Sequence, residues 1–195
     1  GNLKLYAGPE AFNHYAEWLR TIGEPVLPRS GALWILRVGL LAAVVVHIAA
    51  AWAVTRDAWA ARPRKYAVHH RVSRATGYAA RTMRWGGVII LLFVLYHLAH
   101  FTFGWRWAHP DFQRGDVYHN VVTGFSVWWV SGFYLLAQLA LGLHLYHGLW
   151  SLCQSMGWNH PRYNAWRRRF AALFAWVVTV GNLSFPIAVL TGIVD

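Results

Sequence analysis

The chain has 195 residues, of which 57% are hydrophobic and 16% aromatic, with a formal net charge of +11 and a single cysteine. This apolar and aromatic content excludes a disordered chain, and one cysteine excludes a disulfide scaffold. Apolar runs of about twenty residues indicate a membrane protein instead. The basic residues follow the loops between those runs and form no groove-reading motif, so we expect no nucleic-acid partner.

In chain order, residues 1–30 come first and contain a short amphipathic helix that begins at Pro9 and is ended by Gly23 and Pro25. Four stretches long enough to cross a bilayer follow. They cover about 33–54, 85–103, 125–153 and 170–194. The third is the longest, which indicates either tilt or extension past the membrane surface. We therefore predict an all-α transmembrane helical bundle, with residues 1–195 forming one membrane-anchor domain.

The charges of the loops predict how the bundle is oriented. Loop 56–84 carries eight basic residues against one acid, Asp57, and loop 154–169 carries four arginines. The loop after the second span holds two arginines balanced by two aspartates. The positive-inside rule therefore places loops 56–84 and 154–169 in the cytoplasm, and the N-terminal segment and C-terminus outside. We expect a multi-pass protein of a bacterial cytoplasmic membrane.

Five histidines lie inside the apolar spans, where ionisable side chains are rare and usually functional. They are His47, His97, His100, His144 and His147. His47 and His144 lie about 13 Å from the cytoplasmic ends of their helices, whereas His97 lies about 20 Å from its own. Two imidazoles at one depth on different helices can ligate a haem. Any one of them taken alone could instead be a neutral histidine that bonds to a neighbouring helix.

Other interpretations of these residues have less support. A zinc site needs three or four converging ligands, and the apolar spans contain no acid and only the isolated Cys153. A proton relay would also favour Asp or Glu. A transporter would show paired repeats or broken half-helices, and neither is evident.

Several segments resemble the single-chain, b558-type cytochrome b membrane anchor of succinate dehydrogenase, a family related also to fumarate reductase. They are "GNLKLYAGPEAFNHYAEWLRTIGEP", "GLLAAVVVHIAAAW", "ARTMRWGGVIILLFVLYHLAHFTFG" and "LALGLHLYHGLWSLCQSMGWNHPRY". The resemblance covers essentially the whole chain, and the order and spacing of the segments make it specific. Anchors of this family have five transmembrane helices, the first of which precedes a Gly-Asn-Leu sequence like the one at Gly1. The expectation is therefore that an N-terminal helix with a haem-ligating histidine precedes the sequence given.

The resemblance implies one or two haem b groups. It makes His47 and His144 the axial ligands of the haem nearer the cytoplasm, in agreement with their depth, and His97 one ligand of an outer haem. His147 and His100, each three residues from a proposed ligand, remain alternatives.

The implied function is electron transfer in respiratory complex II. The family's anchor binds a flavoprotein subunit and an iron-sulfur subunit on its cytoplasmic side and passes electrons from succinate to a membrane quinone, here expected to be menaquinone. The candidate contacts for quinone or haem propionate are Arg81, Arg84, Trp85, His69 and Trp158, although contact with lipid phosphate or a partner subunit would explain each of them equally well. The alternative function is the di-haem cytochrome b anchor of a hydrogenase or formate dehydrogenase.

Overall fold

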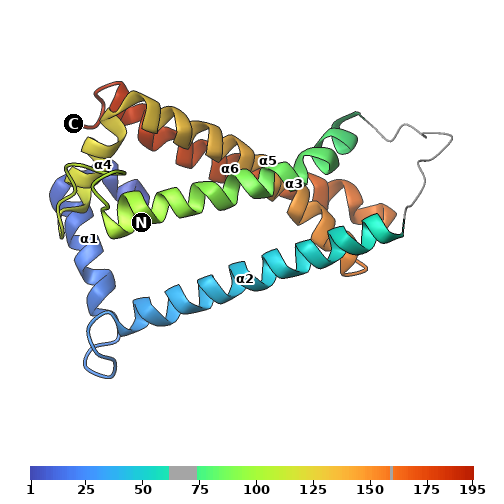
Figure 1. The fold of residues 1–195 in the computed structure, drawn as a ribbon, viewed down its shortest axis with the longest axis horizontal. Helices are drawn as coiled ribbons and strands as arrows, with labels where there is room; N and C mark the ends of the chain where they lie inside the picture. The colour runs from blue at the N-terminus through green and yellow to red at the C-terminus, as the bar shows by residue number, and fades with distance from the viewer. Residues whose placement is uncertain (62–73, 159) are drawn as a thin grey trace. The chain divides into compact units, whose positions relative to one another are not determined.

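The computed structural model describes residues 1–61, 74–158 and 160–195, and within them the side chains of all but 74–81. The described residues form helices and connecting turns, which confirms the all-α prediction (Figure 1). In chain order the helices are the 3-10 helix η1 (Asn2–Ala7), α1 (Pro9–Thr21), α2 (Gly31–Ala60), α3 (Arg74–His97), the π-helix η2 (Leu98–Phe103), α4 (Val117–Ser126), α5 (Trp128–Ser155) and α6 (Pro161–Leu190).

Four of the described helical segments are long and apolar enough to cross a membrane, so the chain is a multi-pass membrane protein. They are Gly31–Ala60, Thr82–Phe103, Trp128–Ser155 and Pro161–Leu190. The expected short helix also forms: α1 begins at Pro9 and ends at Thr21, two residues before Gly23 adopts a positive φ.

The helices differ from the predicted spans at several boundaries. α2 continues to Ala60 and α3 already begins at Arg74, so both helices extend into the predicted loop 56–84. The third span does not begin at Phe125, because Phe125 belongs to α4 and the extended backbone of Val127 separates α4 from α5. The fourth helix begins at Pro161, well before residue 170. Nδ1 of His160 accepts a hydrogen bond from the backbone N–H of Arg162, and Pro161 occupies the first turn, where its missing N–H costs nothing.

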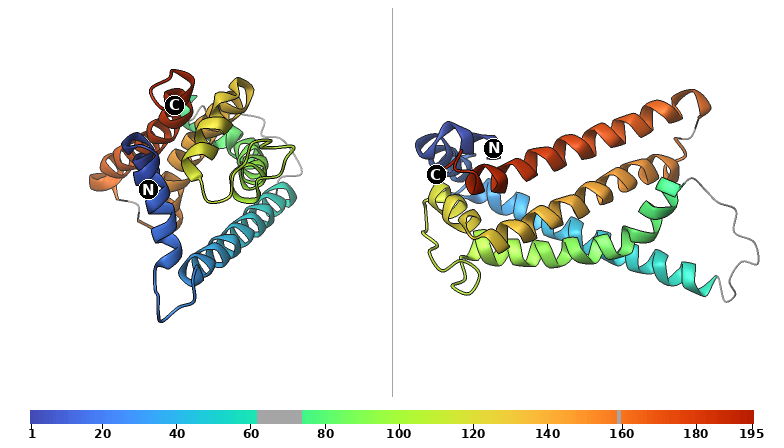
Figure 2. Two further views of the ribbon diagram at one scale, coloured as in Figure 1. Left: turned by 90° about the vertical axis from the view of Figure 1, so that its left-hand side faces the viewer. Right: turned by 90° about the horizontal axis from the view of Figure 1, so that it is seen from above.

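The chain divides into two compact units, residues 13–70 and residues 1–12 with 71–195. The first unit contains α2, in which no side chain is buried against protein. In the second unit α5 lies between α3 and α6 (Figure 2).

The second unit has two distinct ends. At one, which we call the α4 end, η2, α4, the start of α5, the end of α6 and residues 1–12 meet. The Tyr6 hydroxyl donates to Oγ of Ser184 at 2.6 Å, and the Tyr118 hydroxyl donates to the Asp195 carbonyl at 3.0 Å. The opposite end, which we call the basic end, contains the start of α3, the end of α5 and the start of α6. Residues 1–12, the loop after η2 and the C-terminus thus share one end, as the predicted topology requires.

The hydrophobic core of this unit lies at the α4 end. Its buried members are Leu5, Phe12, Phe93, Phe125, Val130, Tyr134, Ala137, Ala188, Val189 and Val194. Further along the helices, the Asn182 side chain of α6 donates to Oε1 of Gln138 on α5 at 3.0 Å. Interhelical hydrogen bonds of this kind fix the register of helices that have no hydrophobic force between them in lipid.

Candidate functional site

A groove of about 290 Å³ runs between α3 and α5 toward the basic end. It contains one imidazole, that of His144. Its lining is otherwise largely apolar and consists of Thr82, Met83, Trp85, Gly86, Ile89, Leu136, Leu139, Ala140 and Leu143. Mostly apolar walls with one metal-binding side chain are typical of a prosthetic-group or small-molecule site.

Two glycines of α3 keep the groove open beside His144. A Cβ atom on Gly87 would lie 3.9 Å from Cε1 of the His144 ring, and a Cβ on Gly86 would meet no atom within 4 Å. The backbone of α3 therefore presents a flat surface at the level of the imidazole. A planar ring could approach this surface closely, whereas larger side chains at Gly86 and Gly87 would occupy the same space.

A second histidine layer lies at the α4 end, around the hydroxyl of Tyr134. This oxygen lies 2.9 Å from Nδ1 of His100 and 3.3 Å from Nδ1 of His97. The rings of Phe93 and Phe101 pack against the His97 ring with centroids 5.7 Å away. Tyr134, which contacts His97, and His144 are ten residues apart on α5, so the two histidine layers are separated by about 15 Å along the helix axis.

The hydrogen-bonded network continues from His100 into the loop that precedes α4. His109, which is 3% exposed, lies with Nδ1 3.4 Å from the His100 carbonyl and Nε2 3.0 Å from the Thr123 hydroxyl. Burial lowers the pKa of His109 below its ordinary value, more strongly than its hydrogen bond to His100 and the charge of Asp111 raise it. At the surface, Nε2 of His119 lies 3.0 Å from a carboxylate oxygen of Asp111.

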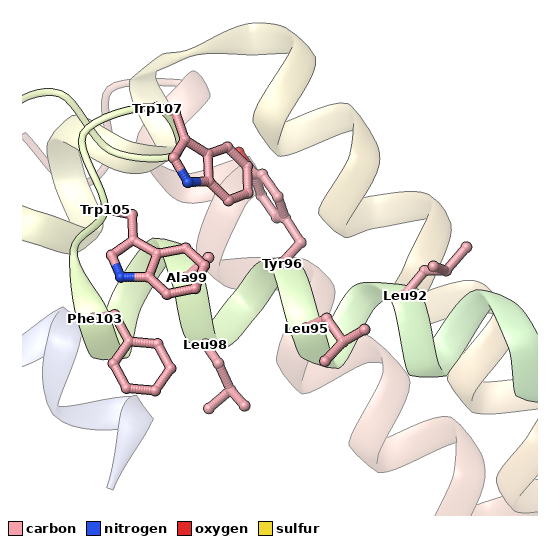
Figure 3. Close-up of a pocket in the computed structure, with 8 residues that line it drawn as sticks. All are labelled: Leu92, Leu95, Tyr96, Leu98, Ala99, Phe103, Trp105 and Trp107. Carbon is pink, nitrogen blue, oxygen red and sulfur yellow. The ribbon is translucent and has the colours of Figure 1, made fainter.

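A second cavity, of about 450 Å³, opens at the α4 end beside the last turns of α3, η2 and the loop after η2 (Figure 3). Trp105 and Trp107 lie over one side of it, and the Tyr96 ring points toward Trp107. The Tyr96 hydroxyl is buried and makes no hydrogen bond within the described residues. The remaining lining residues are Leu92, Leu95, Leu98, Ala99 and Phe103, so no histidine, cysteine or carboxylate lines this cavity.

The histidines predicted as ligands differ in their surroundings. His144 lines the groove, whereas His147, one turn further along α5, is partly buried and does not line it. His97 is partly buried, and His100 is only 1% exposed. His47 is exposed on α2 in the unit 13–70, so its pairing with His144 stays a prediction.

Among the residues predicted to contact quinone or propionate, Trp85 lines the groove and is 73% exposed. Arg84 and Trp158 are also exposed but do not line it. His69 lies outside the described residues, as does the side chain of Arg81.

Sequence reasoning missed Tyr134, which connects the two histidines of the α4 end. The available signal was its hydroxyl in an apolar span, since such a group needs a partner in lipid. Within the described parts of the chain, no three or more His, Cys, Asp or Glu side chains gather as they would around a zinc ion. Comparison with models of known protein families, with curated proteins and with solved structures found no match.

Proposed function

We propose that this protein is the haem b-containing membrane anchor of a succinate:quinone oxidoreductase. In this role it passes electrons from an iron-sulfur subunit to a membrane quinone, with menaquinone as the expected species. The dehydrogenase chemistry takes place on the partner flavoprotein. The proposal rests on the arrangement of histidines in the spans together with the segments that resemble this family.

One observation carries most weight: the His144 imidazole lies in an apolar groove that is also lined by Gly86, and Gly87 of the same helix adds no side chain beside the imidazole. A porphyrin needs an imidazole nitrogen for the iron, apolar surface for its faces, and small residues where its edge meets a helix. The groove supplies all three. A histidine that served only to connect two helices would need none of this open space.

The residues then take separate roles. His144, with His47 from α2, would hold the iron of one haem, and His97 would supply an axial ligand to a second haem about 15 Å further along the bundle. Haem iron supplies one-electron redox chemistry at each position. The protein binds and orients the rings, excludes water from them, and adjusts their potentials through burial and hydrogen bonds to the ligating imidazoles.

The basic end fits the partners expected on that side. Arg84, Arg162, Arg168 and Arg169 are exposed there, and Arg168 lies over the Trp150 ring. A surface of exposed arginines attracts acidic protein surfaces, haem propionates and lipid phosphates. Trp85, at the mouth of the groove, would contact a quinone ring or a propionate.

The test is to purify the protein in mild detergent with whatever subunits accompany it, and to measure the haem-to-protein ratio and the reduced-minus-oxidised spectrum. We expect a b-type spectrum and copurification with a flavin-containing chain. His144→Ala should remove one haem and His97→Ala the other, whereas His14→Ala on the exposed face of α1 should remove neither. A preparation without haem would contradict the proposal, and a metal hydrogenase or formate dehydrogenase as the copurifying chain would favour the alternative anchor.

A further inference from the structure

The hydroxyl of Tyr134 lies between two imidazoles and can give its proton to only one of them. The side chain is 4% exposed, and its oxygen is within hydrogen-bonding distance of Nδ1 of both His97 and His100. A hydroxyl carries one proton, and a neutral imidazole carries its own proton on one ring nitrogen only. If Tyr134 donates to one histidine, it must accept from the other, so the tautomers of His97 and His100 are coupled and opposite.

The surroundings of the two rings decide which one can bind a metal through Nε2. A Cβ atom on Gly124 of α4 would lie 2.9 Å from both Cε1 and Nε2 of His100. The Nε2 edge of His100 is therefore covered by the backbone of α4. The His97 side chain is partly exposed, whereas His100 is only 1% exposed, so we assign the iron to His97.

A ligating imidazole must present the Nε2 lone pair, so its proton is on Nδ1. In that state His97 donates Nδ1–H to the Tyr134 oxygen, Tyr134 donates its proton to Nδ1 of His100, and His100 carries its own proton on Nε2. The opposite arrangement leaves a proton on Nε2 of His97 and blocks ligation.

We propose that Tyr134 is a positioning residue for the haem bound by His97, and that His100 is the acceptor that keeps the Tyr134 proton away from His97. The inference rests on the proposed function, because it concerns a haem. By accepting a hydrogen bond from Nδ1–H of His97, Tyr134 would increase the electron donation of the imidazole to iron and favour the ferric state. Neither Tyr134 nor His100 contacts the iron.

Tyr134→Phe in the purified complex tests this role, because it removes one oxygen and keeps the ring. Loss of a hydrogen-bond partner of a metal-bound histidine typically weakens metal binding 10- to 100-fold. A tenfold loss of binding affinity that is confined to the ferric state raises the midpoint potential of this haem by about 59 mV. The haem at His144 should keep its potential and spectrum, which shows that the variant is folded.

Tyr96→Phe is the matched control. Tyr96 belongs to the same aromatic cluster, with its ring centroid 6.2 Å from that of Tyr134, but its hydroxyl makes no hydrogen bond to the part of the chain that the structure describes. This variant should leave both potentials unchanged.

Two variants of His100 test whether its hydrogen bond to Tyr134, and not only its packing, affects haem binding at His97. His100→Leu removes the acceptor, so the Tyr134 hydroxyl donates to Nδ1 of His97 instead. The occupancy of the haem bound by His97 should then fall several-fold. His100→Asn keeps a carbonyl oxygen near the position of Nδ1 and should restore most of the occupancy.

A potential in Tyr134→Phe equal to that in Tyr96→Phe would overturn the inference, as would full occupancy in His100→Leu. If both haems are present in the unmodified protein, either result would leave the proposed function standing. A protein without haem would reject both together.

Discussion

The two ends of the α3, α5 and α6 bundle are packed in different ways. At the α4 end, aromatic and aliphatic side chains from residues 1–12, the four helices α3 to α6 and the C-terminal residues close a core. The histidines His100 and His109 there have hydrogen-bond partners within the protein. Toward the basic end, α3 and α5 enclose a groove, and the buried residues of α6 are small alanines, Ala171 and Ala175. At the α4 end the described histidines are packed against protein, and the cavity of about 450 Å³ there is lined by no histidine. At the other end space is left beside the His144 imidazole.

Under the proposed function, this difference suggests different roles for the two haems. Empty apolar space lined by side chains forfeits dispersion contacts, so a groove of this size is stable only if lipid or a bound group fills it. At the α4 end the helices are already held together by protein contacts. A haem bound at His144 would therefore affect the packing of the bundle, and a haem bound at His97 would mainly respond to it.

The largest effect on haem content is expected when a side chain fills the groove. Gly86→Leu places four carbon atoms in space that is open in the structure, so we expect the haem associated with His144 to be lost almost entirely while the helices still assemble. Haem content and the spectrum of the remaining haem measure this. Gly132→Leu is the control, because Gly132 is exposed on α5 away from the groove and its Cβ would also meet open space. Equal haem contents in the two variants would mean that the groove holds lipid only.

A smaller effect, on the stability of the protein, is expected when one methyl group is added at the α4 end and, in a matched variant, at the groove. Gly124→Ala would press a Cβ to 2.9 Å from the His100 ring, which cannot move away because it is buried and bonded to Tyr134. Overpacking of this kind typically costs about 1–3 kcal/mol, against which the better helix propensity of alanine returns up to about 1 kcal/mol.

Gly87→Ala is the matched variant at the groove, where the added Cβ makes an ordinary contact at 3.9 Å. We expect its stability to be unchanged or slightly raised. Thermal unfolding of both variants in the same detergent measures the difference, and equal melting temperatures would contradict the view that the α4 end is the tightly packed one.

The smallest effect concerns pH and is confined to the α4 end. Because burial lowers the pKa of folded His109 below its ordinary value of 6.5, the unfolded chain binds more protons in the range just below 6.5. The free energy of unfolding should therefore fall as the pH drops through that range, by at most about 1.4 kcal/mol per pH unit for this one proton.

His109→Gln removes the titrating group and keeps a polar end that can reach Thr123. The other titratable groups around this site, His100, Asp111 and His119, are unchanged, so the difference between the two stability profiles reports on His109. Parallel profiles between pH 5 and 7 would show that burial does not lower its pKa.

Much of the architecture was predictable from the sequence because it depends on local composition. A run of about twenty apolar residues must form a helix in lipid, where backbone groups have no water to bond to, and four such runs predicted the four spans. The amphipathic helix from Pro9 was predictable for a similar reason, since proline and glycine restrict the backbone directly. The boundary between α4 and α5 at Val127 could not be predicted, because an apolar residue gives no local signal that the helix is interrupted there.

The sequence by itself also identified which histidines lie inside the spans, since depth along a helix follows from residue number. It favoured His144 by depth and left His147 and His100 as alternatives, because residues three apart on a helix share nearly the same face. Only the tertiary structure shows the surroundings of these rings: His144 faces a groove because Gly86 and Gly87 of another helix lie opposite, and His100 is covered because Gly124 allows α4 to approach. Contacts between distant segments depend on the shapes of both partners, and no local pattern encodes them.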